Sequence, residues 1–162
     1  METAEILQST EVALQPWAKA VSRPYSDRLD VAIDAGDLVA AVSAMHNGHM
    51  GYLAAITGLD HPAPALKTAE GTPAAPEAGE LEVLYSFCQG AAVITLRVKV
   101  PSASATIPSI CDVIPSATLY ERELSELFGI EVKGTPSTSR LLLSDDWPEG
   151  VYPLLKSFKG LS

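Results

Sequence analysis

Two consecutive stretches, Leu81-Glu-Val-Leu-Tyr-Ser-Phe-Cys88 and Val93-Ile-Thr-Leu-Arg-Val-Lys-Val100, decide the fold class of this chain. In each stretch every second residue is apolar, which is the period of a strand with one buried face. Gln89-Gly90 between them is a turn sequence, so we expect the two strands to pair as an antiparallel hairpin. The chain is therefore expected to contain a β-sheet with one face against a core.

Three further elements are expected on the N-terminal side of this hairpin. Apolar residues at loosely helical spacing predict a first helix over residues 3–21, and alternation over residues 28–34 predicts a strand. Asp34 fits the cap of a following helix, and Asn47-Gly48 is expected to end that helix with a left-handed residue. The apolar run at residues 50–57 predicts another strand.

On the C-terminal side, proline and glycine mark the expected limits of two helices. Pro108 suits the first turn of a short helix over residues 107–114. Thr118 and Glu121 match a capping box that opens a longer helix, and Gly129 is expected to stop it.

These elements together predict an α/β fold, with a mixed sheet of about four strands, covering helices and an extended C-terminal tail. An α/β domain is expected over residues 1–129. Within it, residues 61–79 are rich in proline, glycine and alanine and predict an exposed flexible loop that begins at a solvated His61. Residues 130–162 carry apolar side chains without a periodic element. They are expected to form a tail that binds a partner, and the alternative is a tail packed on its own core.

The composition excludes several classes of protein. With 20 acidic and 11 basic residues the formal charge is −9, which argues against duplex nucleic acid as the main partner. The N-terminus has no secretory pattern, and no apolar run approaches the roughly 20 residues of a spanning helix, so membrane contact is expected only through a partner. Cys88 and Cys111 lie in apolar surroundings and are too few for a disulfide framework or a four-cysteine metal site.

The sequence contains no convincing catalytic motif. Asn-Gly separates His46 from His49 and breaks the helix, so the two rings share no fixed face for a metal ion. There is no Gly-x-Ser-x-Gly motif and no glycine-rich phosphate loop. Asp145 and Asp146 stand in irregular chain and are expected to be solvated. We therefore assign no catalytic, cofactor-binding or metal-binding residue.

The helix expected near Tyr-Glu-Arg-Glu-Leu-Ser-Glu-Leu-Phe-Gly-Ile, residues 120–130, crowds charges beside an apolar stripe. Arg122 and Glu126 project opposite the stripe and can pair one turn apart, for about 0.3 kcal/mol. Glu123 lies near the boundary of the buried face, where an unpaired carboxylate is costly. It is either an edge glutamate that reaches water or a carboxylate paired with a basic group of this or another chain.

This stretch resembles the signature of the 30-kDa subunit family of NADH:quinone oxidoreductase (respiratory complex I). The family includes the equivalent subunits of group 4 membrane-bound hydrogenases. The resemblance covers about residues 28–160 and rests on these further stretches: Ile107-Pro-Ser, Ile114-Pro-Ser-Ala, Arg140-Leu-Leu-Leu and Asp145-Asp-Trp-Pro-Glu-Gly-Val-Tyr-Pro-Leu154. The chain departs from the family at Thr135, Ser139 and Leu155, where the family has ionisable side chains.

The resemblance implies a non-catalytic structural subunit in the hydrophilic arm of a complex I-like, ion-translocating oxidoreductase, peripheral on the cytoplasmic side of the membrane. Its implied partners are the large quinone-site or NiFe-type subunit and the iron–sulfur subunits. The iron–sulfur clusters and the quinone or NiFe site would belong to those partners, and this chain would hold no cofactor. A subunit of a group 4 hydrogenase or related energy-converting complex is the alternative to a quinone reductase.

Seven residues of the helix and the tail are the candidates for docking a partner: Glu121, Arg122, Glu123, Glu126, Arg140, Trp147 and Lys156. A remote alternative is a free-standing small enzyme that uses the acids of residues 121–126 for acid–base chemistry. Such an enzyme needs a pocket and a carboxylate with a shifted pKa.

Overall fold

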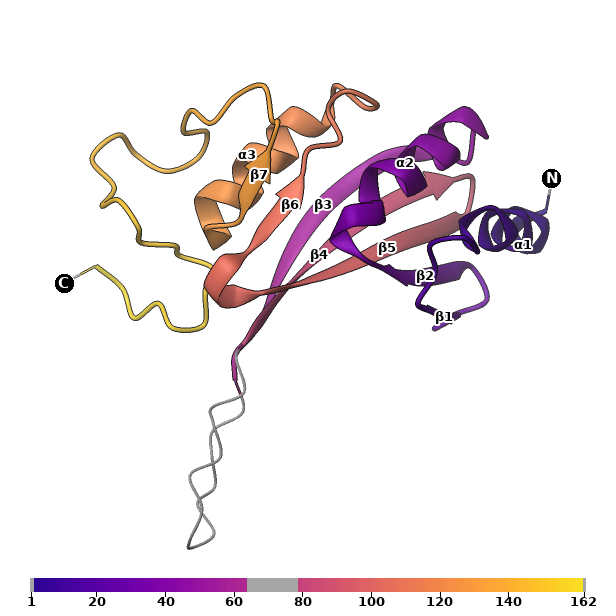
Figure 1. Ribbon diagram of the computed structural model, residues 1–162, viewed down its shortest axis with the longest axis horizontal. Coiled ribbons are helices and arrows are strands. Elements are labelled where there is room, and N and C mark those ends of the chain that lie inside the picture. Colours follow the sequence, from indigo (N-terminus) through magenta and orange to yellow (C-terminus); the bar gives the residue numbers. More distant parts are fainter. Residues whose placement is uncertain (1, 64–78, 162) are drawn as a thin grey trace, which may run out of the picture.

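The computed structural model describes residues 2–63 and 79–161, so most of the segment expected to be a loop lies outside the described residues. The central feature is a five-stranded mixed sheet in the order β1-β2-β5-β4-β3, in which β2 and β5 run parallel and the other neighbours antiparallel (Figure 1). The strands are β1 (Ala20–Ser22), β2 (Arg28–Ile33), β3 (Tyr52–His61), β4 (Glu80–Gln89) and β5 (Ala92–Pro101). This confirms the α/β class, with one strand more than expected in the main sheet.

The hairpin predicted from the alternating stretches is confirmed as β4 and β5. Its turn contains Gly90, whose φ of 59° suits glycine. The apolar residues of β2, β4 and β5 point to one face and form a large part of the core: Leu29, Val31, Ile33, Leu81, Val83, Tyr85, Phe87, Ile94, Leu96, Val98 and Val100.

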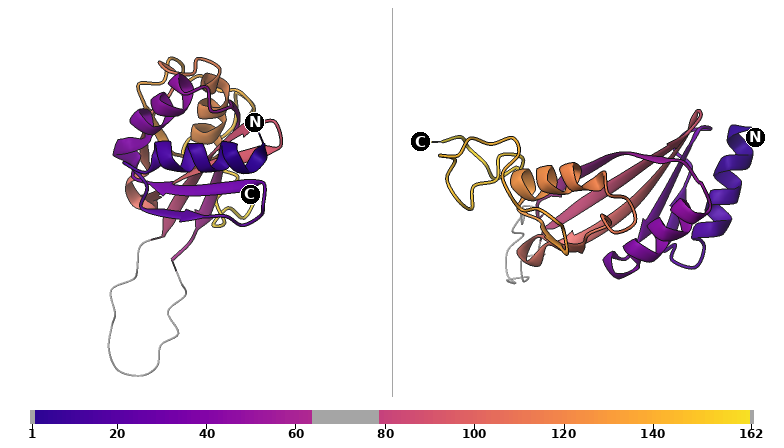
Figure 2. Two further views of the ribbon diagram at one scale, coloured as in Figure 1. Left: turned by 90° about the vertical axis from the view of Figure 1, so that its right-hand side faces the viewer. Right: turned by 90° about the horizontal axis from the view of Figure 1, so that it is seen from above.

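Three helices accompany the sheet: α1 (Thr3–Leu14), α2 (Leu38–Asn47) and α3 (Ala117–Phe128). Figure 2 shows α2 and α3 over the same face of the sheet. Helix α1 packs against α2, β2 and β5, whereas α3 packs against β3. The opposite face of the sheet, called here the open face, is not covered by a helix of the described chain.

The first helix is shorter than the predicted range of residues 3–21. It ends at Leu14 because Pro16 has no backbone N–H to continue the helical hydrogen bonds. Residues 20–22 instead form β1, which pairs with β2.

The end of α2 also differs in detail from the expectation. Gly48 keeps a helical backbone, with φ at −79°, and its N–H still donates to the Ala44 carbonyl. The left-handed residue is His49, whose φ is 53°. The next strand therefore starts at Tyr52 rather than at residue 50, and it continues to His61.

The predicted helix at residues 107–114 is wrong. Thr106–Pro108 forms strand β6, which pairs in parallel with β7 (Glu131–Lys133) in a separate two-stranded sheet. Turns rather than a helix follow β6. The Ile110 N–H donates to the Glu121 side chain of α3 instead of to a backbone carbonyl of a helix. Strand β7 lies in a segment for which the sequence predicted no element, and its Val132 is buried in the core.

Helix α3 ends as predicted at Gly129, which adopts the left-handed conformation with φ at 73°. A Cβ at this position would also lie 2.5 Å from the Tyr152 ring, so glycine allows the close approach of the tail. The expected capping box is wrong: the helix starts at Ala117, and the Glu121 carboxylate binds elsewhere.

From Gly134 to Leu161 the chain forms no helix or strand and follows an irregular path beside α3 (Figure 1). The division into a domain at 1–129 and a partner-binding tail at 130–162 stays a prediction. No helix within residues 2–63 and 79–161 has the length and hydropathy to cross a bilayer.

Candidate partner-docking site on helix α3 and the tail

Glu121 is a buried carboxylate that braces the chain after β6. Its exposed fraction is 1%. One carboxylate oxygen accepts the Ile110 N–H at 2.8 Å, and the other accepts the Ser109 hydroxyl at 2.8 Å and the Cys111 thiol at 3.1 Å. Burial and the Glu121 charge raise the pKa of the Cys111 thiol. If residues 109–111 moved away, the buried Glu121 side chain would lose its hydrogen-bond donors, which is costly. Glu121 therefore holds this turn segment against α3.

Arg122 and Glu126 bind the tail rather than each other. The Arg122 guanidinium donates to the Ser139 carbonyl at 2.9 Å and to the Arg140 carbonyl at 2.8 Å. Glu126 accepts the three successive backbone N–H groups of residues 141–143, at 3.1, 2.9 and 2.7 Å. These two side chains, called the tail-binding pair, hold five consecutive residues of irregular backbone on the helix.

The electrostatics of Glu126 follow from this geometry. Burial acts to raise its pKa, but the N–H groups of residues 141–143 and the nearby charge of Arg140 outweigh burial, so its pKa lies below the usual value. Glu126 is therefore held as a carboxylate, in the form that accepts all three N–H groups.

Arg140 and Trp147 shape the tail itself. The Arg140 guanidinium donates to the Trp147 carbonyl at 2.6 Å and to the Ser144 carbonyl. The Trp147 indole N–H donates to the Val151 carbonyl at 2.8 Å, and its ring centroid lies 6.1 Å from that of Phe158. Both side chains thus close local turns of a segment that has no ladder of backbone hydrogen bonds.

Lys156 contacts the sheet through its backbone. Its N–H donates to the Asp60 carboxylate at 2.7 Å, and the Leu154 N–H donates to the Leu127 carbonyl at 3.1 Å. The Lys156 residue is exposed, and its ammonium forms no hydrogen bond or ion pair with any described residue. The tail therefore returns to β3 and to the end of α3 before the chain ends.

Glu123 differs from the other charged residues of α3. It is half-buried and lines a hollow of about 100 Å³ with residues of β3, α3 and the tail. Within residues 2–63 and 79–161 its carboxylate has no hydrogen bond and no ion pair. The structure thus brings the other acids and Arg122 into contact with their own chain and leaves Glu123 at the surface of the hollow.

A larger cavity, of about 430 Å³, lies between α3 and the tail. Its volume falls within the range of small-molecule sites. The charged groups that line it include Arg122, Glu126 and Arg140, and each of these is already bonded to backbone. The cavity therefore offers a ligand few charged groups that are not already in use.

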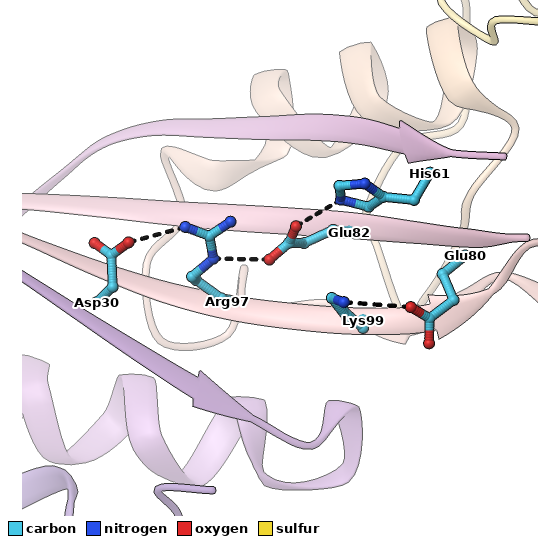
Figure 3. Close-up of polar contacts among 6 residues, drawn as sticks. All are labelled: Asp30, His61, Glu80, Glu82, Arg97 and Lys99. Atoms are coloured by element: carbon cyan, nitrogen blue, oxygen red, sulfur yellow. Dashed lines mark hydrogen bonds and ion pairs between the residues drawn. The ribbon is translucent and has the colours of Figure 1, made fainter. Parts of the chain in front are cut away.

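The open face carries a second charged cluster, which the sequence patterns did not reveal (Figure 3). Arg97 on β5 donates to Asp30 on β2 at 2.8 Å and to Glu82 on β4 at 2.7 Å. The other Glu82 oxygen lies 2.7 Å from the His61 ring on β3. These four residues, called the open-face network, link four adjacent strands. His61 is the last residue of β3 rather than the first residue of a loop, and its side chain is 44% exposed, as expected.

Within this network the Glu82 side chain is only 3% exposed. Burial acts to raise its pKa, and the hydrogen bonds and charges of Arg97 and His61 lower it further than burial raises it. The same contacts with Glu82 and Asp30 raise the pKa of Arg97. Alternation in the sequence predicted that these strands have a polar face. The contacts within the network depend in addition on the register of four strands, which the sequence pattern does not give.

Comparisons with known proteins agree with this architecture. Residues 31–162 match the family described as "Respiratory-chain NADH dehydrogenase, 30 Kd subunit". The membrane-bound hydrogenase subunit beta of Pyrococcus furiosus is 37% identical over 68 residues, which is 42% of this chain and 39% of that protein. An NADH-quinone oxidoreductase subunit of Acidothermus cellulolyticus is 46% identical over 55 residues, which is 34% of this chain and 29% of that protein.

The matched segments thus span well under half the length of these two curated relatives. A chain in the structure of the membrane-bound sulfane sulfur reductase, an archaeal respiratory membrane complex, aligns with a TM-score of 0.68 at 21% identity. That alignment covers 99% of this chain and 88% of the other. At this identity the similarity concerns the fold.

Proposed function

This chain belongs to the respiratory-chain NADH dehydrogenase 30 Kd subunit family, and on that premise we propose that it is a structural subunit of a complex I-like, ion-translocating oxidoreductase. It would lie in the hydrophilic arm, on the cytoplasmic side of the membrane. There it would brace the large quinone-site or NiFe-type subunit and the iron–sulfur subunits. The clusters and the quinone or NiFe site would belong to those partners.

The observation that carries the proposal is the exposed apolar surface of an ordered tail. The tail-binding pair and the contacts at Leu154 and Lys156 give the irregular backbone a defined path. Along that path four leucines are exposed: Leu141, Leu142, Leu154 and Leu161. Apolar side chains presented on a fixed backbone are typical of surfaces that a partner covers.

A group 4 membrane-bound hydrogenase is the second candidate for the assembly. Of the two curated relatives described above, one is a hydrogenase subunit and the other an NADH-quinone oxidoreductase subunit, and each aligns over less than half of this chain. The bracing role is the same in both candidates, and the partners that bind the chain distinguish them.

The pKa shifts do not favour a free-standing acid–base enzyme. The pKa of Glu126 is lowered, and the pKa of the Cys111 thiol is raised. Both shifts move the group away from neutral pH, whereas an acid–base catalyst works best with a pKa near the pH of the reaction.

The test is recovery of the partners from the native cell. The affinity-tagged full chain is purified from membranes in a mild detergent, and the bound proteins are identified by mass spectrometry. We expect a large quinone-site or NiFe-type subunit together with iron–sulfur subunits. A chain that returns as a monodisperse monomer without redox subunits would overturn the proposal.

A paired variant tests the role of the tail. Leu141→Ser combined with Leu142→Ser removes two exposed leucines. Val12→Ser is the matched control, because Val12 is 62% exposed and belongs to α1, which lies at the opposite end of the molecule from the tail (Figure 1). We expect the double variant to recover much less of the partners and the control to recover them normally. Equal recovery from the double variant would show that the tail surface is not the interface.

A further inference from the structure

Glu123 is the one charged residue of α3 whose side chain forms no hydrogen bond or ion pair within the described chain. Glu121 binds the turn segment at residues 109–111, while Arg122 and Glu126 bind the tail. Residue Glu123 is half-buried, and its carboxylate forms no hydrogen bond or ion pair in the part of the chain that the structure describes. The carboxylate is thus available to a cation from outside the described chain.

The hollow beside Glu123 has the size of a site for one side chain. Its volume is about 100 Å³, well below the roughly 300 Å³ at which small-molecule sites begin. Its remaining lining is mostly apolar: Ile56, Thr57, Gly58, Leu124, Phe128 and Leu154. The hollow thus combines an apolar wall with a single negative charge.

Contacts among three elements fix the walls of this hollow. A Cβ at Gly58 on β3 would lie 2.6 Å from the Phe128 ring, so glycine lets that ring pack directly on the strand. On the tail side, the Leu154 N–H donates to the Leu127 carbonyl at 3.1 Å. The cavity is therefore formed when the tail returns to α3.

We propose that this hollow receives one basic side chain, a lysine or an arginine, of a partner subunit. The aliphatic stem would pack on Phe128 and Leu154, and the cationic end would meet Glu123. Long basic side chains suit such a site because they bury an apolar stem and keep a charged end. The chain's formal charge of −9 also favours a basic partner surface. The inference rests on the proposed function, since it names the chemistry of the partner at that interface.

The test uses the tagged full chain with its co-purified complex. Glu123→Gln keeps the shape and removes the charge, Glu123→Lys reverses it, and Asp112→Asn is the control that removes an exposed carboxylate elsewhere. Partner subunits retained on the resin are quantified while the sodium chloride concentration of the wash is raised. We expect E123Q to retain about tenfold less partner than the wild type at intermediate salt, which corresponds to about 1.4 kcal/mol of binding free energy. E123K should retain still less, and D112N should retain as much as the wild type.

Three outcomes would contradict the proposal, each in a distinct way. If E123Q retains partners like the wild type while the Leu141/Leu142 double variant loses them, the hollow takes no cation and the proposed function stands. If the wild-type chain recovers no redox subunits, the proposed function itself fails. If E123Q lowers the thermal unfolding midpoint of the isolated chain, Glu123 has a partner within its own chain, and the intermolecular pair is excluded.

Discussion

The two charged clusters of this molecule satisfy their charges in different ways. In the open-face network, carboxylates meet the Arg97 guanidinium and the His61 ring across neighbouring strands. In the tail-binding pair, Arg122 and Glu126 meet only backbone carbonyl and N–H groups. The first cluster joins elements that already have their backbone hydrogen bonds. The second supplies hydrogen bonds to a segment that has no regular structure.

The difference follows from the demands of the backbone. Strands β4 and β5 lie inside the main sheet and pair with a neighbour on both sides, so their side chains need only satisfy one another. The tail has no ladder, and residues 139–143 would need water or another chain for these groups. Charged side chains of helix α3 supply these hydrogen bonds instead. Arg122 and Glu126 therefore bind the tail backbone and form no ion pair with each other.

The largest effect is expected from breaking the open-face network at its centre. Arg97→Met leaves the buried Glu82 carboxylate with the His61 ring as its remaining side-chain partner, and we expect the free energy of unfolding to fall by about 3 kcal/mol. Urea unfolding followed by circular dichroism measures the change. Adding Glu82→Leu to this variant should recover most of the loss, because the unpaired charge is then gone.

Lys99→Met is the matched control, since the Lys99–Glu80 pair has side chains that are 55% and 49% exposed. Its expected cost is below about 0.5 kcal/mol. An Arg97→Met variant no less stable than Lys99→Met would mean that the open-face network does not stabilise the sheet.

Breaking the tail-binding pair should have a smaller and local effect. Glu126→Ala removes the acceptor of three backbone N–H groups, and we expect the tail to open more easily by about 2 kcal/mol. Hydrogen exchange of the amides of residues 141–143 should accelerate roughly 30-fold, while exchange in β4 and β5 stays unchanged. Uniform acceleration in both regions would instead place the tail within the cooperative unit of the sheet.

A third variant sharpens the comparison at the junction of helix and tail. Gly129→Ala and Gly90→Ala both place a side chain at positive φ, which costs roughly 1–2 kcal/mol. At Gly129 the added Cβ also meets the Tyr152 ring at 2.5 Å, whereas nothing lies within 4 Å at Gly90. We expect Gly129→Ala to lose about 1 kcal/mol more in urea unfolding. Equal losses would show that the tail moves aside without cost.

The smallest effect should be the pH dependence of the tail. The pKa of Glu126 is lowered from its ordinary value of 4.5 in the folded state. Its contribution to stability is therefore complete above that value and is lost as the pH falls through the lowered pKa. We expect tail amides of the wild type to lose protection in acid, after correction for intrinsic exchange. Glu126→Gln should show weak protection with no such acid transition, and an unchanged transition in that variant would assign it to another group.

Sequence patterns predicted those helices and strands whose residues alone show a clear period. Alternation predicted β4 and β5, and the apolar stripe with Gly129 predicted the body and the end of α3. Strands β6 and β7 have three residues each, too few to show a period, and they exist because their partner lies close in space. Glu121 fitted a capping box by spacing alone, but tertiary packing gave its carboxylate better donors in a distant turn.

The candidate site divides in the same way. The charge-rich helix and the matching tail stretches pointed to Arg122, Glu126, Arg140 and Trp147, which the structure places at one junction. Their contacts with backbone could not be read from residue types. The open-face network was beyond prediction, because its members come from four strands whose register had not been fixed. Docking of a partner by the seven candidates stays a prediction.

The parallel pairing of β2 with β5 has a consequence for how the chain folds during its synthesis. Arg97 meets Asp30, which is 67 positions earlier in the chain, so β2 has no neighbour on this side until β5 has been made. The antiparallel β4–β5 hairpin needs only local closure and is expected to form first, whereas long-range parallel pairing is slow. On this side the edge of β2 therefore stays unpaired until the β4–β5 hairpin has been synthesised.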